Sequence, residues 1–91
     1  MFRRTTGVLW RAAADRVVAR WCPGEGAGAK AHEVSGWAAF VWMALHSPRP
    51  FAELYEEFEN SGCAEPADEL RVSISLLLDH YLIEKVESQN G

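Results

Sequence analysis

Three histidines and two cysteines are the side chains of this sequence best suited to hold a metal ion. His32, His46 and His80 lie far apart along the chain, as do Cys22 and Cys63. A structural zinc site needs ligands at short, fixed separations, such as Cys-x-x-Cys or His-x-x-x-His, and neither pattern occurs. We therefore expect no metal site, with the imidazoles at the surface and the thiols reduced.

A glycine-rich run and a group of glutamates are the other candidates for chemistry. Residues 24–28 read Gly-Glu-Gly-Ala-Gly, but they lead to no helix N-terminus and lack the lysine and serine of a phosphate-binding loop. Glu53, Glu56, Glu57 and Glu59 could imitate an acid–base pair, yet a predicted surface helix leaves them solvated. They either attract a basic peptide or keep the protein soluble, and solubility is the favoured interpretation. The sequence thus predicts no catalytic residue, no cofactor and no enzyme.

Length and composition describe one small domain without a nucleic-acid surface. The chain has 91 residues, 48% of them hydrophobic, four tryptophans and a formal net charge of −4. This length suits a single domain over 1–91, with a core over about 7–87. The acidic balance disfavours DNA or RNA as a partner, because phosphates are bound by clustered Lys and Arg.

The apolar segments predict a cytoplasmic protein. None approaches the roughly 20 consecutive apolar residues that cross a bilayer, so no membrane partner is expected. The N-terminal residues Met1–Thr6 carry positive charge but lack the apolar run of a secretory leader. Two cysteines are also fewer than a disulfide scaffold of this size normally carries.

Three strands are predicted in the first third of the chain. Residues 7–12 and 16–22 are rich in β-branched and aromatic side chains and are separated by a short break at 13–15, which predicts a β-hairpin. Residues 23–29 contain three glycines and one proline and form a predicted loop. Residues 30–34 are the predicted third strand.

Three helices are predicted to follow. The first runs from about Gly36 to His46, with Ser35 suited to cap it, and is apolar nearly all round, so we expect it to lie centrally. The second begins with Pro50 in its first turn, where a missing N–H breaks no hydrogen bond. The third covers about 66–81, and 82–87 form a last short strand.

The third predicted helix carries two apolar stripes. At 100° per residue one stripe faces the other helices, whereas Val72 and Leu76 lie on nearly the opposite side, which a surface helix normally keeps polar. They are either stray exposed aliphatics, which are common, or the lining of a groove for a partner, and periodicity alone does not decide. The inward stripe consists of Leu70, Ile74, Leu77, Leu78 and Tyr81.

Several short apolar motifs between Val8 and Val86 follow one another in a specific order. They are Val8-Leu-Trp-Arg11, the Val34-Ser-Gly36 junction, Ala38-Ala39 with Val41-Trp42 and Leu45, Glu53-Leu54, and Leu77 with Leu82-Ile83. Together they resemble the PqqD-like family of leader-peptide-binding domains, also called RiPP recognition elements. The chain departs from the family pattern at turns, including Tyr81, where the family usually places Gly before the final Leu-Ile.

The resemblance implies an α+β fold that is winged helix-turn-helix-like, with a three-stranded antiparallel sheet followed by three helices. It also implies a stand-alone domain that binds the leader of a ribosomally synthesised precursor peptide. The leader adds as a strand beside the third strand, with side chains facing the third helix. The domain would present the peptide to a tailoring enzyme of natural-product biosynthesis, such as a radical-SAM protein, a cyclase or a protease.

Strand addition uses the unpaired N–H and C=O groups of an edge strand, while alternate peptide side chains enter apolar surface beside it. The expected site therefore joins the third strand to the outward side of the third helix. Its predicted peptide-binding residues are Lys30, Ala31, His32, Glu33, Val34, Val72, Ser73, Leu76, Asp79 and His80.

Two other functions fit the same predicted architecture. A winged-helix DNA-binding transcriptional regulator should carry Arg, Lys, Asn or Gln along its recognition helix. The third helix here offers Arg71 among acids and aliphatics, which favours a peptide over DNA. The remaining possibility is a structural homodimer joined through the same edge strand.

Overall fold

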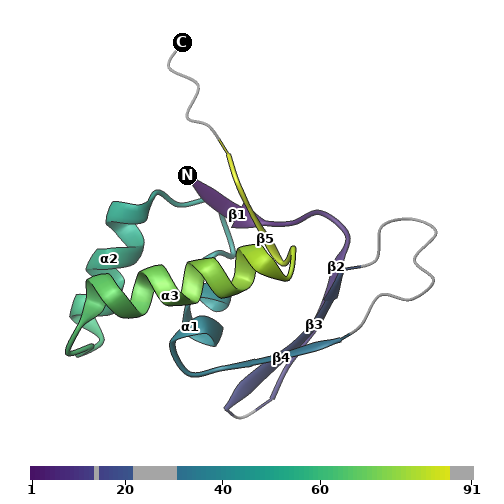
Figure 1. The fold of residues 1–91 in the computed structure, drawn as a ribbon, viewed down its shortest axis with the longest axis horizontal. Coiled ribbons are helices and arrows are strands. Elements are labelled where there is room, and N and C mark those ends of the chain that lie inside the picture. The colour runs from purple at the N-terminus through teal and green to yellow at the C-terminus, as the bar shows by residue number, and fades with distance from the viewer. Residues whose placement is uncertain (14, 22–30, 87–91) are drawn as a thin grey trace.

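The computed structural model describes residues 1–13, 15–21 and 31–86, so Cys22 and Lys30 lie outside the described residues. These ranges form a small α+β domain with two antiparallel sheets and three helices (Figure 1). In chain order the elements are β1 (Phe2–Arg4), β2 (Val8–Ala12), β3 (Arg16–Trp21), β4 (His32–Ser35), α1 (Gly36–Ala44), α2 (Phe51–Asn60), α3 (Pro66–Asp79) and β5 (Ile83–Lys85).

The predicted hairpin and third strand are confirmed, and they form one antiparallel sheet in the order β2–β3–β4. Val17 of β3 pairs with Val34 of β4, and both side chains are buried against the helices. Successive residues of a strand point to opposite faces. Leu9 and Val18 therefore lie on the outer face, where both are exposed.

A second sheet, made of β1 and β5, corrects the expectation of a single three-stranded sheet. Phe2 pairs with Lys85, Arg3 with Glu84 and Arg4 with Ile83. β5 confirms the predicted last strand, whereas β1 is absent from the expected elements. A segment of three residues with two arginines shows no alternating apolar pattern, so only its distant partner makes it a strand.

Helix α1 is central, as its apolar sequence predicts. It packs against α3 and against β3 and β4, and Val41 and Trp42 are almost completely buried. Ser35 occupies the N-cap position with extended backbone, but its side chain makes no capping hydrogen bond. That detail of the prediction is wrong. Pro50 likewise lies at the N-cap of α2, one position before the first turn.

Arg4 fastens β1 to the end of α1. Its Nε and Nη2 donate hydrogen bonds to the carbonyl oxygen of Trp42 at 3.0 and 2.8 Å. The guanidinium carbon lies 4.7 Å from the ring centroids of both Trp10 and Trp42, within cation–π range. Partial burial lowers the pKa of Arg4 from its usual value. The three side chains join β1, β2 and α1.

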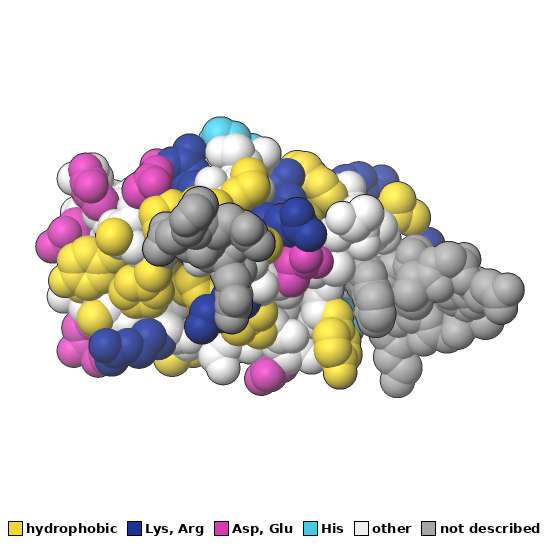
Figure 2. All heavy atoms as spheres, turned by 90° about the horizontal axis from the view of Figure 1, so that it is seen from above, with side chains coloured by type: hydrophobic (Ala, Val, Ile, Leu, Met, Phe, Trp, Pro, Cys, Tyr) yellow, Lys and Arg dark blue, Asp and Glu magenta, His cyan; other side chains and the backbone are white. Residues whose placement is uncertain are grey.

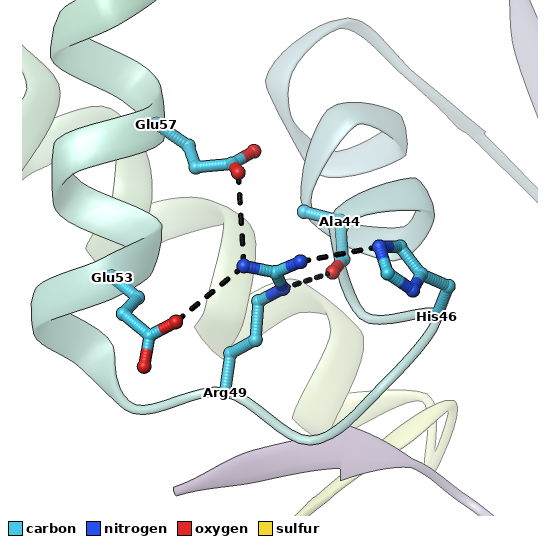
Figure 3. Close-up of polar contacts among 5 residues, drawn as sticks. All are labelled: Ala44, His46, Arg49, Glu53 and Glu57. Carbon is cyan, nitrogen blue, oxygen red and sulfur yellow. Dashed lines mark hydrogen bonds and ion pairs between the residues drawn. The ribbon is translucent and has the colours of Figure 1, made fainter.

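Arg49 connects the end of α1 to α2 (Figure 3). Its Nε donates to the carbonyl oxygen of Ala44 at 2.8 Å, and Nη2 lies 3.2 Å from Nε2 of His46. Nη1 lies 3.5 Å from the carboxylate of Glu53 and 3.7 Å from that of Glu57. One mostly buried guanidinium thus reaches two helices at once.

Replacing Arg49 with Lys should lower the free energy of unfolding by about 1–2 kcal/mol, because an ammonium cannot reproduce this planar set of donors. Urea denaturation measures the change. Arg71→Lys is the control, since Arg71 and Asp68 lie 3.9 Å apart with side chains 71% and 74% exposed. We expect it to change stability by less than about 0.5 kcal/mol. Equal losses in the two variants would show that Arg49 contributes only as a surface charge.

Candidate functional site

β4 is an edge strand of its sheet. Within the part of the chain that the structure describes, it pairs with β3 on one side and with no strand on the other. In an antiparallel pair, the backbone groups of successive residues point alternately toward the partner and away from it. Two of the four residues His32–Ser35 therefore direct their N–H and C=O groups toward the outer edge.

A pair of histidines joins β4 to α3. His32 starts β4 and shares its inward face with Val34, and its ring stacks on that of His80. The ring centroids are 4.0 Å apart, with planes inclined by 29°. His80 is the C-cap of α3. Figure 1 accordingly shows the yellow-green end of α3 on the side of the molecule where β4 begins.

The turn after α3 holds His80 in this position. The N–H of Leu82 donates to the carbonyl of Leu77 at 2.9 Å, and that of Tyr81 to Leu78 at 3.0 Å. Together they form a Schellman motif, which needs a left-handed residue after the cap. Tyr81 supplies it with φ of 59°. The predicted burial of Tyr81 is therefore wrong, since α3 ends at Asp79 and the Tyr81 side chain is exposed.

The exposed aliphatic residues of α3 lie on the side that leads to His80. Val72 is 65% exposed and Leu76 is 38% exposed. Residues four apart on a helix are neighbours, so Val72, Leu76 and His80 form a continuous row, called here the α3 row. Leu76 precedes His80 by about one helical turn, so it lies on the same side of α3 as the contact between His80 and β4. We call this row together with His32–Ser35 the α3–β4 surface.

The structure brings only some of the predicted site residues to this surface. Ser73 is 4% exposed and lies in the core side of α3, so it is not available to a partner. The Val34 side chain is buried as well, which leaves its backbone. Asp79 is exposed at the end of α3, and Ala31 is exposed just before β4.

Glu33 points to the other face of the sheet. Arg16 donates from Nη1 to its carboxylate at 2.9 Å. The negative charge of Glu33, with a smaller contribution from that of Asp15, raises the pKa of Arg16. A peptide on the α3–β4 surface would meet the backbone of Glu33 and not its side chain.

Ser35 is a member of the candidate site that sequence reasoning missed. It ends β4, whereas the predicted strand stops at Val34. Its predicted N-cap position indicated that it could belong to the strand, because an N-cap residue has extended backbone angles and can also be the last residue of a strand. The observed values, φ −134° and ψ 176°, satisfy both roles.

Two apolar hollows lie elsewhere on the described surface and were not predicted. One, of about 350 Å³, lies between the hairpin and α1 and includes Phe40 and Met43. The other, of about 330 Å³, is formed by the sheet and includes Leu9 and Val18. Both are alternative places where an apolar ligand group can contact the protein.

Comparison with family models, with curated proteins and with solved structures gave no match. In residues 1–13, 15–21 and 31–86, no helix combines the length and apolar character needed to span a membrane. In the same ranges, no three His, Cys, Asp or Glu side chains gather closely enough to hold a metal ion.

Proposed function

We propose that this domain binds the leader segment of a ribosomally synthesised precursor peptide by strand addition to β4. The observation that carries the proposal is the α3–β4 surface, in which the exposed Val72 and Leu76 lead along α3 to His80, whose ring contacts the edge strand β4. The stacked rings of His32 and His80 connect β4 to the end of α3. The resemblance to PqqD-like domains points to the same pair of elements.

In this proposal β4 and α3 contribute to peptide binding in different ways. The outer edge of β4 supplies backbone hydrogen bonds, which accept many peptide sequences. Val72 and Leu76 supply apolar contact that only some side chains satisfy. The interface is small, below about 1,200 Å², so its affinity depends on a few buried anchors. Binding orders a flexible peptide, and this entropic loss further limits the affinity.

The biological role that we propose is that of an adaptor. The three-stranded sheet and the three helices form a winged helix-turn-helix-like arrangement that holds the leader in the cytoplasm without reacting with it. A tailoring enzyme, such as a radical-SAM protein, a cyclase or a protease, then acts on the rest of the precursor. A precursor-like reading frame and a modifying enzyme beside the gene support this role, whereas a lone transcription unit counts against it.

Leu76→Asp should weaken peptide binding by about tenfold or more, because it places a charge where an apolar side chain is to be buried. A binder selected from displayed random peptides serves as the probe, with affinity measured by NMR titration. We expect shifts in His32–Ser35, Val72, Leu76 and His80. Leu9→Asp is the control, because it makes the same change on the outer face of the sheet, where Leu9 is exposed.

Either of two results would refute the proposed site. One is a binder whose shifts map to the hollows at Phe40 and Met43 or at Leu9 and Val18. The other is Leu76→Asp binding as tightly as the unchanged protein. Failure of the whole library to yield a binder would refute strand addition itself.

A further inference from the structure

The α3 row extends beyond its apolar part toward the start of the helix. Asp68 lies one turn before Val72 and is exposed. The row therefore reads Asp68, Val72, Leu76 and His80, at intervals of four residues. It begins with a carboxylate, continues with two aliphatic side chains and ends at the imidazole that contacts β4.

The spacing of this row matches the repeat of an extended peptide. Four residues of an α-helix rise by about 6 Å. Two residues of a β-strand advance by about 6.6–6.8 Å, and side chains two apart share a face. Alternate side chains of a peptide strand therefore meet successive members of the row. Along the helix axis the mismatch over three intervals reaches only about 2 Å, which flexible side chains can absorb.

The direction of the bound peptide follows from the chain directions of β4 and α3. In Figure 1, α3 and β4 run in opposite directions. A peptide paired antiparallel to β4, the more stable arrangement, therefore runs in the same direction as α3. Its first residues lie beside the first turns of the helix, and its last ones lie beside His80.

Charge distinguishes the two ends of the row. Glu65, Asp68 and Glu69 carry three carboxylates at the start of α3, against the single guanidinium of Arg71. Figure 2 shows acidic side chains, in magenta, gathered at the end of the molecule that holds α2 and the start of α3. Asp79 is the one carboxylate in the last turn. A cationic side chain is therefore favoured at the N-terminal end of the peptide.

From this geometry we infer the class of peptide that the α3–β4 surface selects: an extended segment with a basic residue, then two aliphatic residues, each separated by one position. The basic side chain meets Asp68 and Glu69, and the aliphatic ones meet Val72 and Leu76. The inference rests on the proposed function, and it adds the register, the direction and the charge of the ligand.

Synthetic peptides test the pattern directly, with affinity and binding site both read from NMR titration of the whole domain. The reference peptide is Lys-Thr-Val-Thr-Leu-Thr-Thr. Lys-Thr-Val-Leu-Thr-Thr-Thr keeps the composition but turns one aliphatic side chain away, so it should bind about tenfold more weakly. The reversed sequence, Thr-Thr-Leu-Thr-Val-Thr-Lys, and a variant with Glu in place of Lys should each lose about threefold at low salt.

A protein variant isolates the charge contribution. Asp68→Asn with Glu69→Gln should abolish the preference for Lys over Glu and leave a peptide with Thr at that position unaffected. Glu53→Gln with Glu56→Gln removes two carboxylates from α2 and should leave the preference intact.

The outcomes separate the inference from the proposed function. If all the peptides bind at β4 and α3 with equal affinity, the pattern is wrong and strand addition stands. If the reversed peptide binds best, the direction is wrong. If no peptide shifts β4 or α3, both the inference and the proposed function fail.

Discussion

Phe58→Ala should remove a large part of the stability of this domain. The Phe58 side chain is 0% exposed, and its ring centroid lies 4.8 Å from that of Trp37 and 5.3 Å from that of Phe40. Truncating a buried Phe lowers the free energy of unfolding by about 3–5 kcal/mol, through lost burial and the cavity left behind. Small domains have only about 5–15 kcal/mol in total. Urea denaturation followed by circular dichroism measures the loss.

Phe51 supplies a matched control in the same helix. It starts α2 and is 37% exposed, so Phe51→Ala should lower stability by about 1 kcal/mol or less. A similar loss in the two variants would mean that the aromatic cluster of Trp37, Phe40 and Phe58 is not the main link between α1 and α2.

Arg4→Ala should lower the free energy of unfolding by about 2–3 kcal/mol. Hydrogen bonds from a charged donor contribute about 1.5–3 kcal/mol, and stacking of a cation on an indole adds about 0.5–1 kcal/mol. Arg4 makes two such bonds to the carbonyl of Trp42, and its guanidinium lies 4.7 Å from the ring centroids of both Trp10 and Trp42. Denaturation followed by tryptophan fluorescence measures the effect.

Arg3 is the control for Arg4, since it is the preceding residue of the same strand. Its guanidinium pairs with Glu84 at 2.7 Å between solvent-exposed side chains. Arg3→Ala should therefore lower stability by less than about 1 kcal/mol, and salt should reduce that loss further. The Arg4 effect should persist in salt. If salt abolished it, the contact with Trp42 would be an ordinary surface interaction.

The elements predicted from sequence are those that depend on local patterns. The hairpin shows two runs of strand-forming residues, α1 is a continuous apolar run with boundary residues, and α3 has a helical periodicity. β1 has no such signal, because Arg3 and Glu84 are separated by 81 positions in the sequence. Tyr81 was misassigned for a related reason. The residue after a helix cap is normally Gly, and a tyrosine there extends the apparent helix.

Part of the candidate site was equally visible in the sequence. Periodicity places Val72 and Leu76 away from the core, and both are exposed. Ser73 was misplaced because a hydroxyl suggests surface, although a spacing of four residues puts it only about 40° around the helix from buried Leu77. The contact between His32 and His80 depends on how α3 is positioned over the sheet, which no local pattern specifies.

The pairing of β1 with β5 has a consequence for how the chain folds during synthesis. β1 leaves the ribosome ahead of the other elements, and β5 follows after all of them. The hairpin and α1 can form while the chain is still growing, because their contacts are local. β1 meanwhile remains an unpaired strand, open to pairing with other chains. Two arginines in its three residues oppose such pairing during the delay.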